Sequence, residues 1–586
     1  MSFVSLLKDD VRLAVAQVDE FGNAVKAAQS VTLAPTTGIA AAARDEVSAA
    51  VAAVFSSHGR TFQSLCTQAV AFNEKFTGTL VSALGSYVST ETTAIEGFLA
   101  NPLDTAARAL APLNPRTAAS TIGLVMGGSG IPLPNFNIPN YVSIADQLYI
   151  HPNFPDTTYP NPYANGLFTP EYAIGAVPFS MNFPTATTGI LAGFPALNTS
   201  MGQGLLILEN AIKTNLANGV NSTVFGWSQS SSISGLVMER LDPSGQPSPN
   251  SGLQFVLVGD PSAPNGGLLQ RYTGLSMPSF GIQFGGSTPS NSYPTSIYTL
   301  EYDGYADFPK YPINFLADLN AVIGFEAVHQ LYLTPQIITP AVLSHAILLP
   351  GSENLGTQNL TNYYMIPTSA LPYPHNYLPL LQPLLDVPLV GKPLADLLQP
   401  DLSVLVNLGY GPNNVGYSTP ANIPTPIGLF PDITPATLMH QLAGGAAQGW
   451  NAFVGDIQHE VAPMPITGSA IAQLPLPNFA HGWDAASLPS FDPLPTVTRI
   501  ANTLSTASTS LLYPVLPIAA LASDLLTAVP AYNLGLFMAN ISNPLYALAL
   551  PVAADVGIAT VAGYVATAIL LQNWLGAVTS VLSLIA

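Results

Sequence analysis

Short runs of apolar residues, bounded by turn-forming residues, recur through the middle of the chain and are typical of buried strands. Four of them stand out, at residues 121–126, 223–225, 254–258 and 296–302. A segment with helical periodicity, residues 231–241, follows the second run and places Ile233, Leu236 and Met238 on one face. Strands and helices that alternate in this way predict an α/β fold.

The first ninety residues follow a helical pattern instead. Residues 5–30 and 37–90 are expected to be helical, and Pro35 separates them. Apolar residues in the second segment recur mostly at every third or fourth position: Val47, Val51, Val54, Phe55, Phe62, Leu65, Val70, Phe72 and Phe76. The simplest arrangement is an all-α helical hairpin over residues 1–95.

The length of the chain, 586 residues, exceeds the size at which a single core stops growing, so several units are expected. Prolines mark a linker over residues 96–117, an α/β domain follows over 118–385, and a Pro/Leu-rich and apolar region occupies 386–586. Residues 131–200 are rich in proline, asparagine and aromatic residues. They are a candidate lid or substrate-binding insertion, although burial of the aromatic rings is the commoner explanation.

The C-terminal tail is almost free of charge. After Arg499 the only charged residues are Asp524 and Asp555, and the run from Val556 to Leu571 is nearly all apolar or small. A membrane span needs about 20 such residues, but prolines interrupt the tail and no basic residues flank it to fix an orientation. Three alternatives follow: a membrane span, adhesion to a lipid-rich envelope, or packing onto the α/β domain.

The pentapeptide 226–230, Gly-Trp-Ser-Gln-Ser, connects the second predicted strand to the predicted helix. A strand, a Gly-x-Ser-x-small turn and a helix together form the elbow that carries the nucleophile of many serine hydrolases. The turn strains the backbone of Ser228, exposes its hydroxyl and directs the helix N-terminus toward a developing oxyanion. The usual fifth glycine is Ser230, which is also small. A Ser-rich loop before an ordinary helix is the alternative interpretation.

An elbow serine needs an acid and a base that follow it along the chain. The loop after the run 296–302 contains Asp303 and Asp307, and the next histidine is His329. We expect Ser228, Asp307 and His329 to form the triad, with Asp307 preferred because a few loop residues should separate the strand end from the carboxylate. Asp303 is a close rival to Asp307, and His345 is a weaker rival to His329. Asp260 comes one position too early, directly after the run 254–258.

The run 121–126 opens into Gly127-Gly128-Ser129-Gly130. Glycines let backbone N–H groups converge on one point, so Gly128 or Ser129, together with Gln229, is expected to form an oxyanion hole. The alternatives are an ordinary glycine-rich turn or a phosphate-binding loop, but the chain has no Gly-Lys-Ser/Thr motif. A serine hydrolase or acyltransferase is therefore the favoured function class.

Composition excludes several other classes. The net charge is −19 and only 14 residues are Lys or Arg, so nucleic acid binding is not expected. The single cysteine, Cys66, excludes an intramolecular disulfide and a cysteine-based zinc site. We expect no metal and no cofactor. The N-terminus has no apolar segment of a secretory signal peptide.

The N-terminal region resembles the PE domain of mycobacterial proteins. The matching segments are residues 1–4, 36–48, 55–59, Phe76 and 87–91. One departure is clear, because the Pro-Glu pair expected near positions 8–9 is Lys8-Asp9. The resemblance implies that Tyr87 and Glu91 form a signal for type VII secretion and that the hairpin pairs with a helical PPE-type partner. On spacing alone, these two residues form an ordinary pair on one face of a helix.

The middle of the chain resembles the PE-PPE domain, an α/β serine hydrolase related to cutinases and lipases. The matching segments are residues 126–130, 226–230, 264–267, 302–309 and 328–329. The resemblance implies an α/β-hydrolase fold and a secreted or cell-envelope esterase or lipase acting on esters of apolar acyl chains. The alternatives are an acyltransferase with the same triad and a surface or structural protein without turnover.

Overall fold

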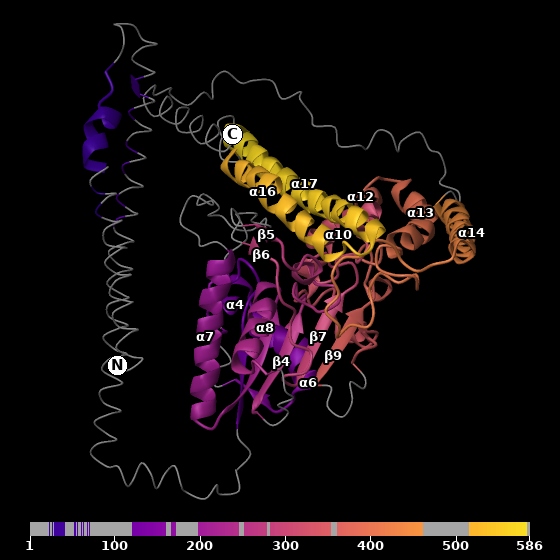
Figure 1. The fold of residues 1–586 in the computed structure, drawn as a ribbon, viewed down its shortest axis with the longest axis horizontal. Helices are drawn as coiled ribbons and strands as arrows, with labels where there is room; N and C mark the ends of the chain where they lie inside the picture. Colours follow the sequence, from indigo (N-terminus) through magenta and orange to yellow (C-terminus); the bar gives the residue numbers. More distant parts are fainter. Residues whose placement is uncertain are drawn as a thin grey trace, which may run out of the picture. The chain divides into compact units, whose positions relative to one another are not determined.

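A computed structural model describes residues 120–159, 166–171, 197–244, 251–277, 282–352, 360–460 and 515–582, with the stretch 29–40 and scattered positions from 23 to 70. The chain divides into two compact units. One comprises residues 1–117, 485–509 and 576–586, and the other comprises 118–484 and 510–575. The second unit contains the sheet (Figure 1). Ser228, Asp303, Asp307 and His329 all belong to this unit.

The positions described from 23 to 37 and from 52 to 70 in the first unit are helical. The helix runs through Pro35 to Thr37, so the predicted break at Pro35 is wrong: a proline can stand in a helix when the local fold tolerates the missing N–H. Side chains join the two segments: Gln29 Nε2 donates to Gln63 O at 3.0 Å and to Thr67 Oγ1 at 2.7 Å. Most of the predicted hairpin over 1–95, including Tyr87 and Glu91, and the predicted linker over 96–117 lie outside the described residues.

A seven-stranded sheet forms the centre of the second unit, with strand order β2-β1-β3-β4-β7-β9-β8. All neighbouring strands pair in parallel except β8 and β9. The strands are β1 (Thr121–Val125), β2 (Thr157–Thr158), β3 (Asn221–Trp227), β4 (Leu253–Val258), β7 (Thr295–Leu300), β8 (Ile347–Leu348) and β9 (Thr361–Ile366). A small ribbon pairs β5 (Ser276–Met277) with β6 (Ile282–Gln283). The four predicted strands and the predicted α/β fold are confirmed.

Helices cover both faces of the sheet. Along β3, Val224 packs into the same apolar cluster as residues of the two long helices before and after that strand, whereas Phe225 packs into the cluster on the opposite face with Tyr141 and Tyr149. The longer helices are α7 (Leu197–Ala217), α8 (Gln229–Leu241), α10 (Phe315–Ala327), α13 (Gly391–Asn407), α14 (Pro435–Glu460), α16 (Val515–Ala539) and α17 (Pro544–Leu582). Short helices are α4 (Pro134–Asn137), α5 (Tyr141–Ala145), η1 (Asp146–Ile150), α6 (His151–Asn153), α9 (Leu268–Arg271), η4 (His329–Leu331), α11 (Pro340–Leu343), η5 (Thr368–Ala370), η6 (Pro379–Leu381) and α12 (Gln382–Leu385).

Part of the stretch 131–200, predicted as a lid or insertion, belongs to the body of the unit. Strand β2 extends the sheet beside β1, and Tyr141 and Tyr149 are fully buried. The Tyr149 hydroxyl donates to the backbone oxygen of Tyr332 at 2.8 Å. Burial therefore accounts for the rings of Tyr141 and Tyr149, whereas Phe168 is 45% exposed.

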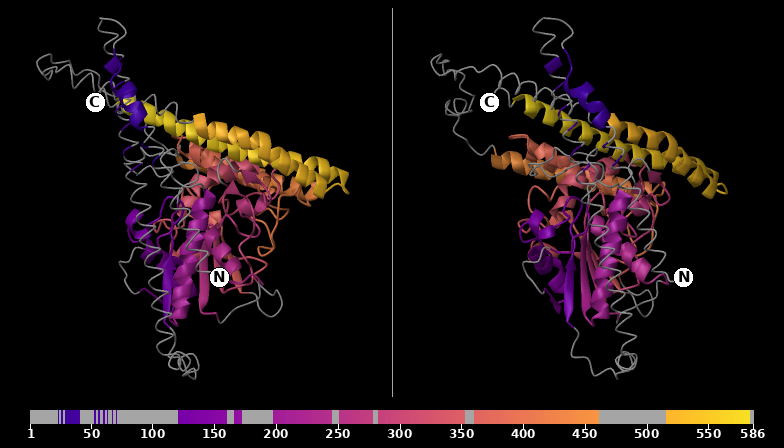
Figure 2. Two further views of the ribbon diagram at one scale, coloured as in Figure 1. Left: turned by 60° about the vertical axis from the view of Figure 1, so that its left-hand side comes forward. Right: turned by 90° about the vertical axis from the view of Figure 1, so that its left-hand side faces the viewer.

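The C-terminal helices α16 and α17 form an antiparallel hairpin, and both views in Figure 2 show them side by side along their length. They share an apolar cluster with the α/β body, in which Ala553, Ala554 and Ile558 of α17 lie with Tyr272 and Phe325. Of the alternatives for the tail, packing onto the α/β domain is therefore the one that this structure contains.

Candidate active site

Ser228 occupies the turn between β3 and α8, as the elbow motif predicts. Its backbone has φ 59° and ψ −118°, a conformation that L-residues adopt only under strain and that recurs at functional turns. Gly226 is required here, because a Cβ at that position would lie 2.8 Å from the carbonyl group of Ser230. Ser228 is half-buried, whereas Trp227 and Gln229 on either side of it are buried.

Ser230, which replaces the usual glycine, stabilises the elbow. Its hydroxyl accepts from the Trp227 N–H at 2.9 Å and donates to the Trp227 carbonyl at 3.1 Å. The side chain thus turns back onto the strand end instead of separating the strand from the helix. The Ser-rich sequence after Ser228 is therefore compatible with a close strand-to-helix turn.

His329 lies beside the serine. Its Nε2 atom is 2.8 Å from Ser228 Oγ, although 101 positions separate the two residues. His329 begins the short helix η4 directly after α10, and only 2% of its surface is exposed. The ring of Tyr305 lies 4.7 Å from the imidazole, centroid to centroid. Aromatic packing therefore holds the imidazole in place and limits the access of water.

Asp303 is the carboxylate that contacts His329. Its two oxygens lie 2.9 and 2.8 Å from His329 Nδ1. Strand β7 ends at Leu300, and Tyr302, with φ 66°, turns the chain sharply after it. This turn brings Asp303 directly to the imidazole, so no longer loop is needed to reach it.

The preference for Asp307 over Asp303 does not fit this geometry. The backbone N–H of Asp307 donates to the Asp303 carbonyl at 2.6 Å, and the Asp307 carboxylate folds back to accept from the Tyr302 N–H at 3.0 Å. Burial raises the pKa of Asp307 well above its ordinary value, and the neighbouring Glu301 and Asp303 add to that rise. We expected several loop residues between the end of the strand and the acid. They are not needed, because the positive φ at Tyr302 turns the chain sharply and brings Asp303 to His329.

The other rivals lie apart from the serine. Asp260 is fully buried after β4 and binds the Ser262 N–H at 2.9 Å and the Thr288 hydroxyl at 2.5 Å. Burial raises its pKa to about 6. His345 is exposed, with Nδ1 2.8 Å from the Ala341 carbonyl oxygen of its own segment. Both residues thus bind groups of their own surroundings and form no hydrogen bond with Ser228.

The glycine-rich loop after β1 lies against the elbow. The Ser129 hydroxyl donates to Gln229 Oε1 at 2.9 Å, and Gln229 Nε2 donates to the Ser200 hydroxyl at 2.6 Å. Gln229 opens helix α8, so its backbone N–H belongs to the first turn, whose N–H groups have no acceptor within the helix. Gly128 must stay small, because a Cβ there would lie 3.0 Å from the Trp227 ring. The structure thus brings Gly128, Ser129 and Gln229 together beside Ser228.

Tyr332 is a member of the site that the sequence did not indicate. Its hydroxyl donates to Asp303 Oδ2 at 2.7 Å and accepts from the Leu300 N–H at 2.8 Å. The tyrosine therefore holds the carboxylate at the end of β7 in the orientation that faces His329. The only local sign of this contact is that Tyr332 stands three positions after His329. Because such a spacing is common in helices, it could not identify Tyr332 as part of the site.

We expect Tyr332→Phe to lower kcat for ester hydrolysis about tenfold and to leave KM unchanged, because loss of the hydroxyl frees the Asp303 carboxylate to rotate without altering substrate contacts. Steady-state kinetics would measure the split. Tyr298→Phe is a matched control, since its hydroxyl binds Asn153 at 2.9 Å and touches no residue of the site. An equal loss in both variants would mean that Tyr332 serves packing alone.

Glu171 predicts a pH dependence of stability. It is fully buried near the glycine-rich loop, and burial raises its pKa from 4.5 to about 8. Between these values the unfolded chain releases the proton that the folded chain retains, so the free energy of unfolding falls as pH rises. We expect a higher melting temperature at pH 5 than at pH 8. Glu171→Gln, which cannot ionise, should reduce the difference, and an unchanged slope would contradict this role.

No group of three or more His, Cys, Asp and Glu residues that could hold a metal ion occurs in the part of the chain that the structure describes. A hydroxyl, an imidazole and a carboxylate in hydrogen-bond contact can transfer an acyl group from an ester.

Comparisons with known proteins agree with the sequence resemblance. A PE family model matches residues 5–94, and a PE-PPE domain model matches residues 160–411. The chain is 38% identical over 455 residues to Esterase PE16 of Mycobacterium tuberculosis, covering 77% of this chain and 76% of that protein. It is 39% identical over 455 residues to PE family protein PE3 of the same species, covering 77% and 87%.

A PPE family protein is also similar. The chain is 41% identical over 461 residues to the M. tuberculosis protein PPE28, which covers 76% of this chain but only 64% of the length of PPE28. No solved structure matches the chain. The matches to PE and PPE proteins, 455 to 461 residues long, extend far beyond the PE family match at residues 5–94.

Proposed function

Because the chain belongs to the PE family and carries a PE-PPE domain, we propose that it is a serine carboxylic-ester hydrolase with an α/β-hydrolase fold. The observation that carries this proposal is the continuous contact from Ser228 Oγ to His329 Nε2 and from His329 Nδ1 to Asp303. The printed name of one relative, Esterase PE16, supports the same reaction class.

In the proposed mechanism, Ser228 Oγ attacks the ester carbonyl carbon while His329 Nε2 takes its proton. The oxyanion of the tetrahedral intermediate accepts hydrogen bonds from the backbone N–H of Gln229 and from that of Gly128 or Ser129. Collapse breaks the ester bond, and the leaving alcohol takes the proton from Nε2. Water then attacks the acyl-serine through the same two proton transfers and releases the acid. Asp303 orients the imidazole and stabilises its charged form.

We infer that the substrate is an ester of an apolar acyl chain. The surroundings of His329 are aromatic: the rings of Trp227 and Tyr305 lie 6.1 and 4.7 Å from the imidazole. Such walls favour apolar groups over charged ones. An acyltransferase would use the same acyl-serine and differ only in the acceptor of the second step.

The direct test is turnover of p-nitrophenyl esters of increasing acyl length by the full chain. We expect an initial burst of p-nitrophenol and an acyl mass increment on the peptide that contains Ser228. Added glycerol or sugar alcohols would separate the alternatives, since a transferase yields the new ester in preference to the free acid. A folded chain that turns over no ester of any length would contradict the proposal.

We propose in addition that the chain is exported by a type VII route with a PPE-type helical partner and is retained at the cell surface or in the cell wall. The family relationship supports this, because the N-terminal 5–94 match is to the PE family and the relatives are mycobacterial. Tyr87 and Glu91, the proposed secretion signal, lie outside the described residues.

The export proposal predicts that replacing Tyr87 and Glu91 with alanine traps the protein in the cytosol. Fractionation of mycobacteria expressing the tagged chain would measure the distribution, with Ser228→Ala as a control that should be exported normally. Unchanged envelope levels of the double variant would remove the basis for both the route and the partner.

A further inference from the structure

The hairpin of α16 and α17 is almost without charge. Its only charged residues are Asp524 and Asp555. Asp524 is buried, with 1% of its surface exposed, and Asp555 accepts a hydrogen bond from Asn533 of the facing helix at 2.7 Å. Neither helix carries a lysine or an arginine. The hairpin therefore has little ionic attraction to offer a partner.

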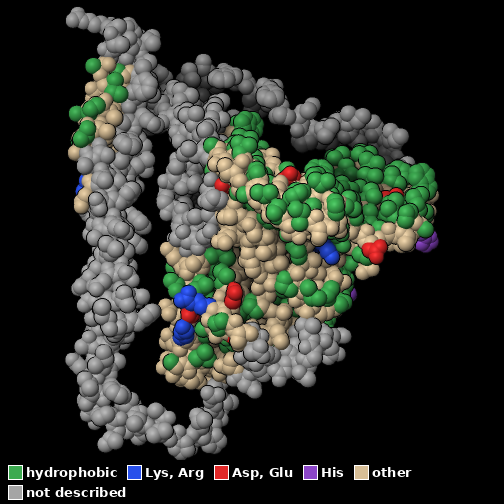
Figure 3. All heavy atoms as spheres, viewed as in Figure 1, with side chains coloured by type: hydrophobic (Ala, Val, Ile, Leu, Met, Phe, Trp, Pro, Cys, Tyr) green, Lys and Arg blue, Asp and Glu red, His purple; other side chains and the backbone are tan. Residues whose placement is uncertain are grey.

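The outer face of the hairpin is apolar. Near the turn between the helices, exposed side chains follow helical spacing in both: Leu534, Met538 and Ile541, then Leu545, Leu548 and Val552. The exposed fractions of Leu545 and Leu548 are 65% and 68%. Figure 3 shows hydrophobic side chains gathered over this part of the molecule. Isolated exposed leucines are ordinary, but a continuous band marks an interaction surface.

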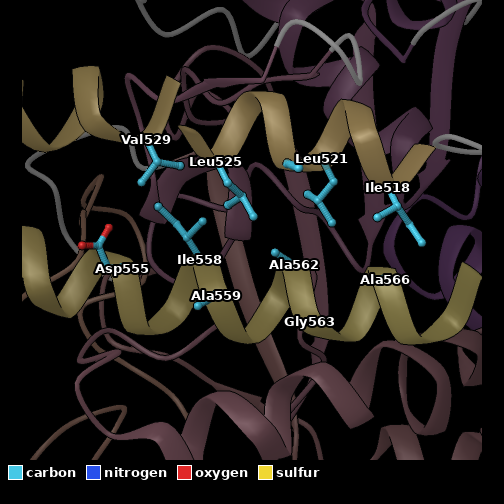
Figure 4. Close-up of a pocket in the computed structure, with 11 residues that line it drawn as sticks. Ile518, Leu521, Leu525, Val529, Asp555, Ile558, Ala559, Ala562, Gly563 and Ala566 are labelled. Carbon is cyan, nitrogen blue, oxygen red and sulfur yellow. The ribbon is translucent and has the colours of Figure 1, made fainter. Parts of the chain in front are cut away.

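An apolar groove runs between the two helices away from the turn (Figure 4). Its volume is about 530 Å³, and Asp555 is the only charged residue in its lining. Leu521, Leu525 and Val529 line it from α16, and small residues such as Ala559 and Gly563 line it from α17. A groove of this kind accepts a flexible hydrocarbon chain more readily than it accepts a folded surface.

The inner face of the hairpin limits how it can meet a membrane. By length and composition, the segment Pro544–Leu575 could cross one, with a mean hydropathy of 1.8. However, Ala553, Ala554 and Ile558 are buried against the body, and a side chain at Gly557 would collide with the Tyr272 hydroxyl. With one face held by the protein, the hairpin has apolar side chains free to meet lipid on its other face alone, which is the arrangement of a helix that lies on a lipid surface.

A lipid surface fits the exposed face better than a protein does. Protein interfaces surround their apolar centre with polar groups and form about one hydrogen bond per 100–200 Å². The band from Leu534 to Val552 has no charged residue, and its polar side chains lie mainly at the turn. Two of them bond within the hairpin itself, because Asn540 donates to the Leu536 carbonyl at 2.8 Å and Asn543 Oδ1 accepts from the Tyr546 N–H at 3.4 Å. The net charge of −19 also disfavours anionic surfaces, so attraction must come from apolar burial.

We propose that the α16–α17 hairpin docks the protein onto the acyl-chain region of an uncharged lipid surface, with the band at its turn inserted and the groove open to one lipid chain. The docking itself does not depend on the proposed esterase activity, but its consequence for catalysis does. The ring of Tyr564 in α17 lies 5.4 Å from that of Phe325, and Phe325 stacks on Tyr305 beside His329. A docked hairpin would therefore bring the active-site loops to the surface from which an ester enters.

The experiment uses the full chain with Ser228→Ala, so that hydrolysis cannot alter the lipids, and measures co-flotation with phosphatidylcholine vesicles. We expect binding that is equal in 0.1 M and 1 M salt. Changing Leu534, Leu545 and Leu548 to glutamine should lower the fraction bound at least about tenfold, because these three leucines are the most exposed of the band and would no longer bury apolar surface in the lipid.

A matched control changes three exposed leucines elsewhere, Leu206, Leu216 and Leu348, to glutamine; they are 49%, 37% and 42% exposed on α7 and β8. The control should float as the parent does, and circular dichroism should show that both variants fold. Equal flotation of the two variants, absence of binding by the parent, or loss of binding in 1 M salt would overturn the proposal. The proposal would also be overturned if the parent were a dimer and the hairpin variant a monomer with unchanged flotation. A second copy of the chain would then cover this face.

Discussion

Ser228→Ala should lower kcat/KM for p-nitrophenyl butyrate by about 10⁵-fold or more, because the acyl-serine can no longer form and only binding and oxyanion stabilisation are left. The folded structure should tolerate the change. Ser228 lies at the surface of the elbow, and its turn is held by Gly226 and by the hydroxyl of Ser230 rather than by its own side chain. Steady-state kinetics with purified variant and native chain would measure the loss.

Ser231→Ala is the matched control for this change. Its hydroxyl is buried in the first turn of α8 and donates to the Val258 carbonyl at 3.1 Å, away from His329. We expect its activity to stay within about tenfold of the native value. A Ser228→Ala variant that kept a comparable share of its activity would place the nucleophile elsewhere.

Asp303→Asn should have the second largest effect, a loss in kcat of about 10³- to 10⁴-fold. Asparagine has a single carbonyl oxygen and an NH₂ group. When the NH₂ group donates to His329 Nδ1, the imidazole proton moves to Nε2, which then cannot take the serine proton. The contacts at 2.8 and 2.9 Å are the reason for this expectation.

Asp307→Asn provides the comparison. The Asp307 carboxylate accepts from the Tyr302 N–H at 3.0 Å, and an amide of the same shape can accept the same hydrogen bond. We expect a loss in kcat of less than about tenfold. A larger loss at Asp307 than at Asp303 would restore the choice that the sequence favoured.

The sequence was sufficient to predict the turn at Ser228 and the contact of that serine with His329, because both signals are local. The apolar run at β3 and the Gly-x-Ser-x-small pattern determine the turn, and His329 is the first histidine after the strand that carries the acid. The acid itself could not be chosen, because the decision depends on one backbone angle at Tyr302. Nothing in the residue types of that loop indicates whether the chain turns immediately after Leu300 or a few residues later.

Two other features depended on contacts between distant parts of the chain. The apolar composition of the tail fits a membrane span and a packed hairpin equally well, and only the burial of Ala553 and Ile558 against the body separates the two. Tyr332 supports Asp303 across 29 positions, a pairing that no periodic pattern contains. The periodicity of the sequence thus predicted helices and strands, whereas the hydrogen bond that holds Asp303 in place depends on a tertiary contact.

Labelling with an active-site fluorophosphonate tests whether Ser228 is the activated nucleophile, because the probe reacts with a serine only where a neighbouring base activates it. The native chain should be labelled on the peptide that contains Ser228, and neither Ser228→Ala nor His329→Ala should be labelled at a comparable rate. Labelling of the native chain at another serine, or undiminished labelling of Ser228→Ala, would show that Ser228 is not the activated nucleophile.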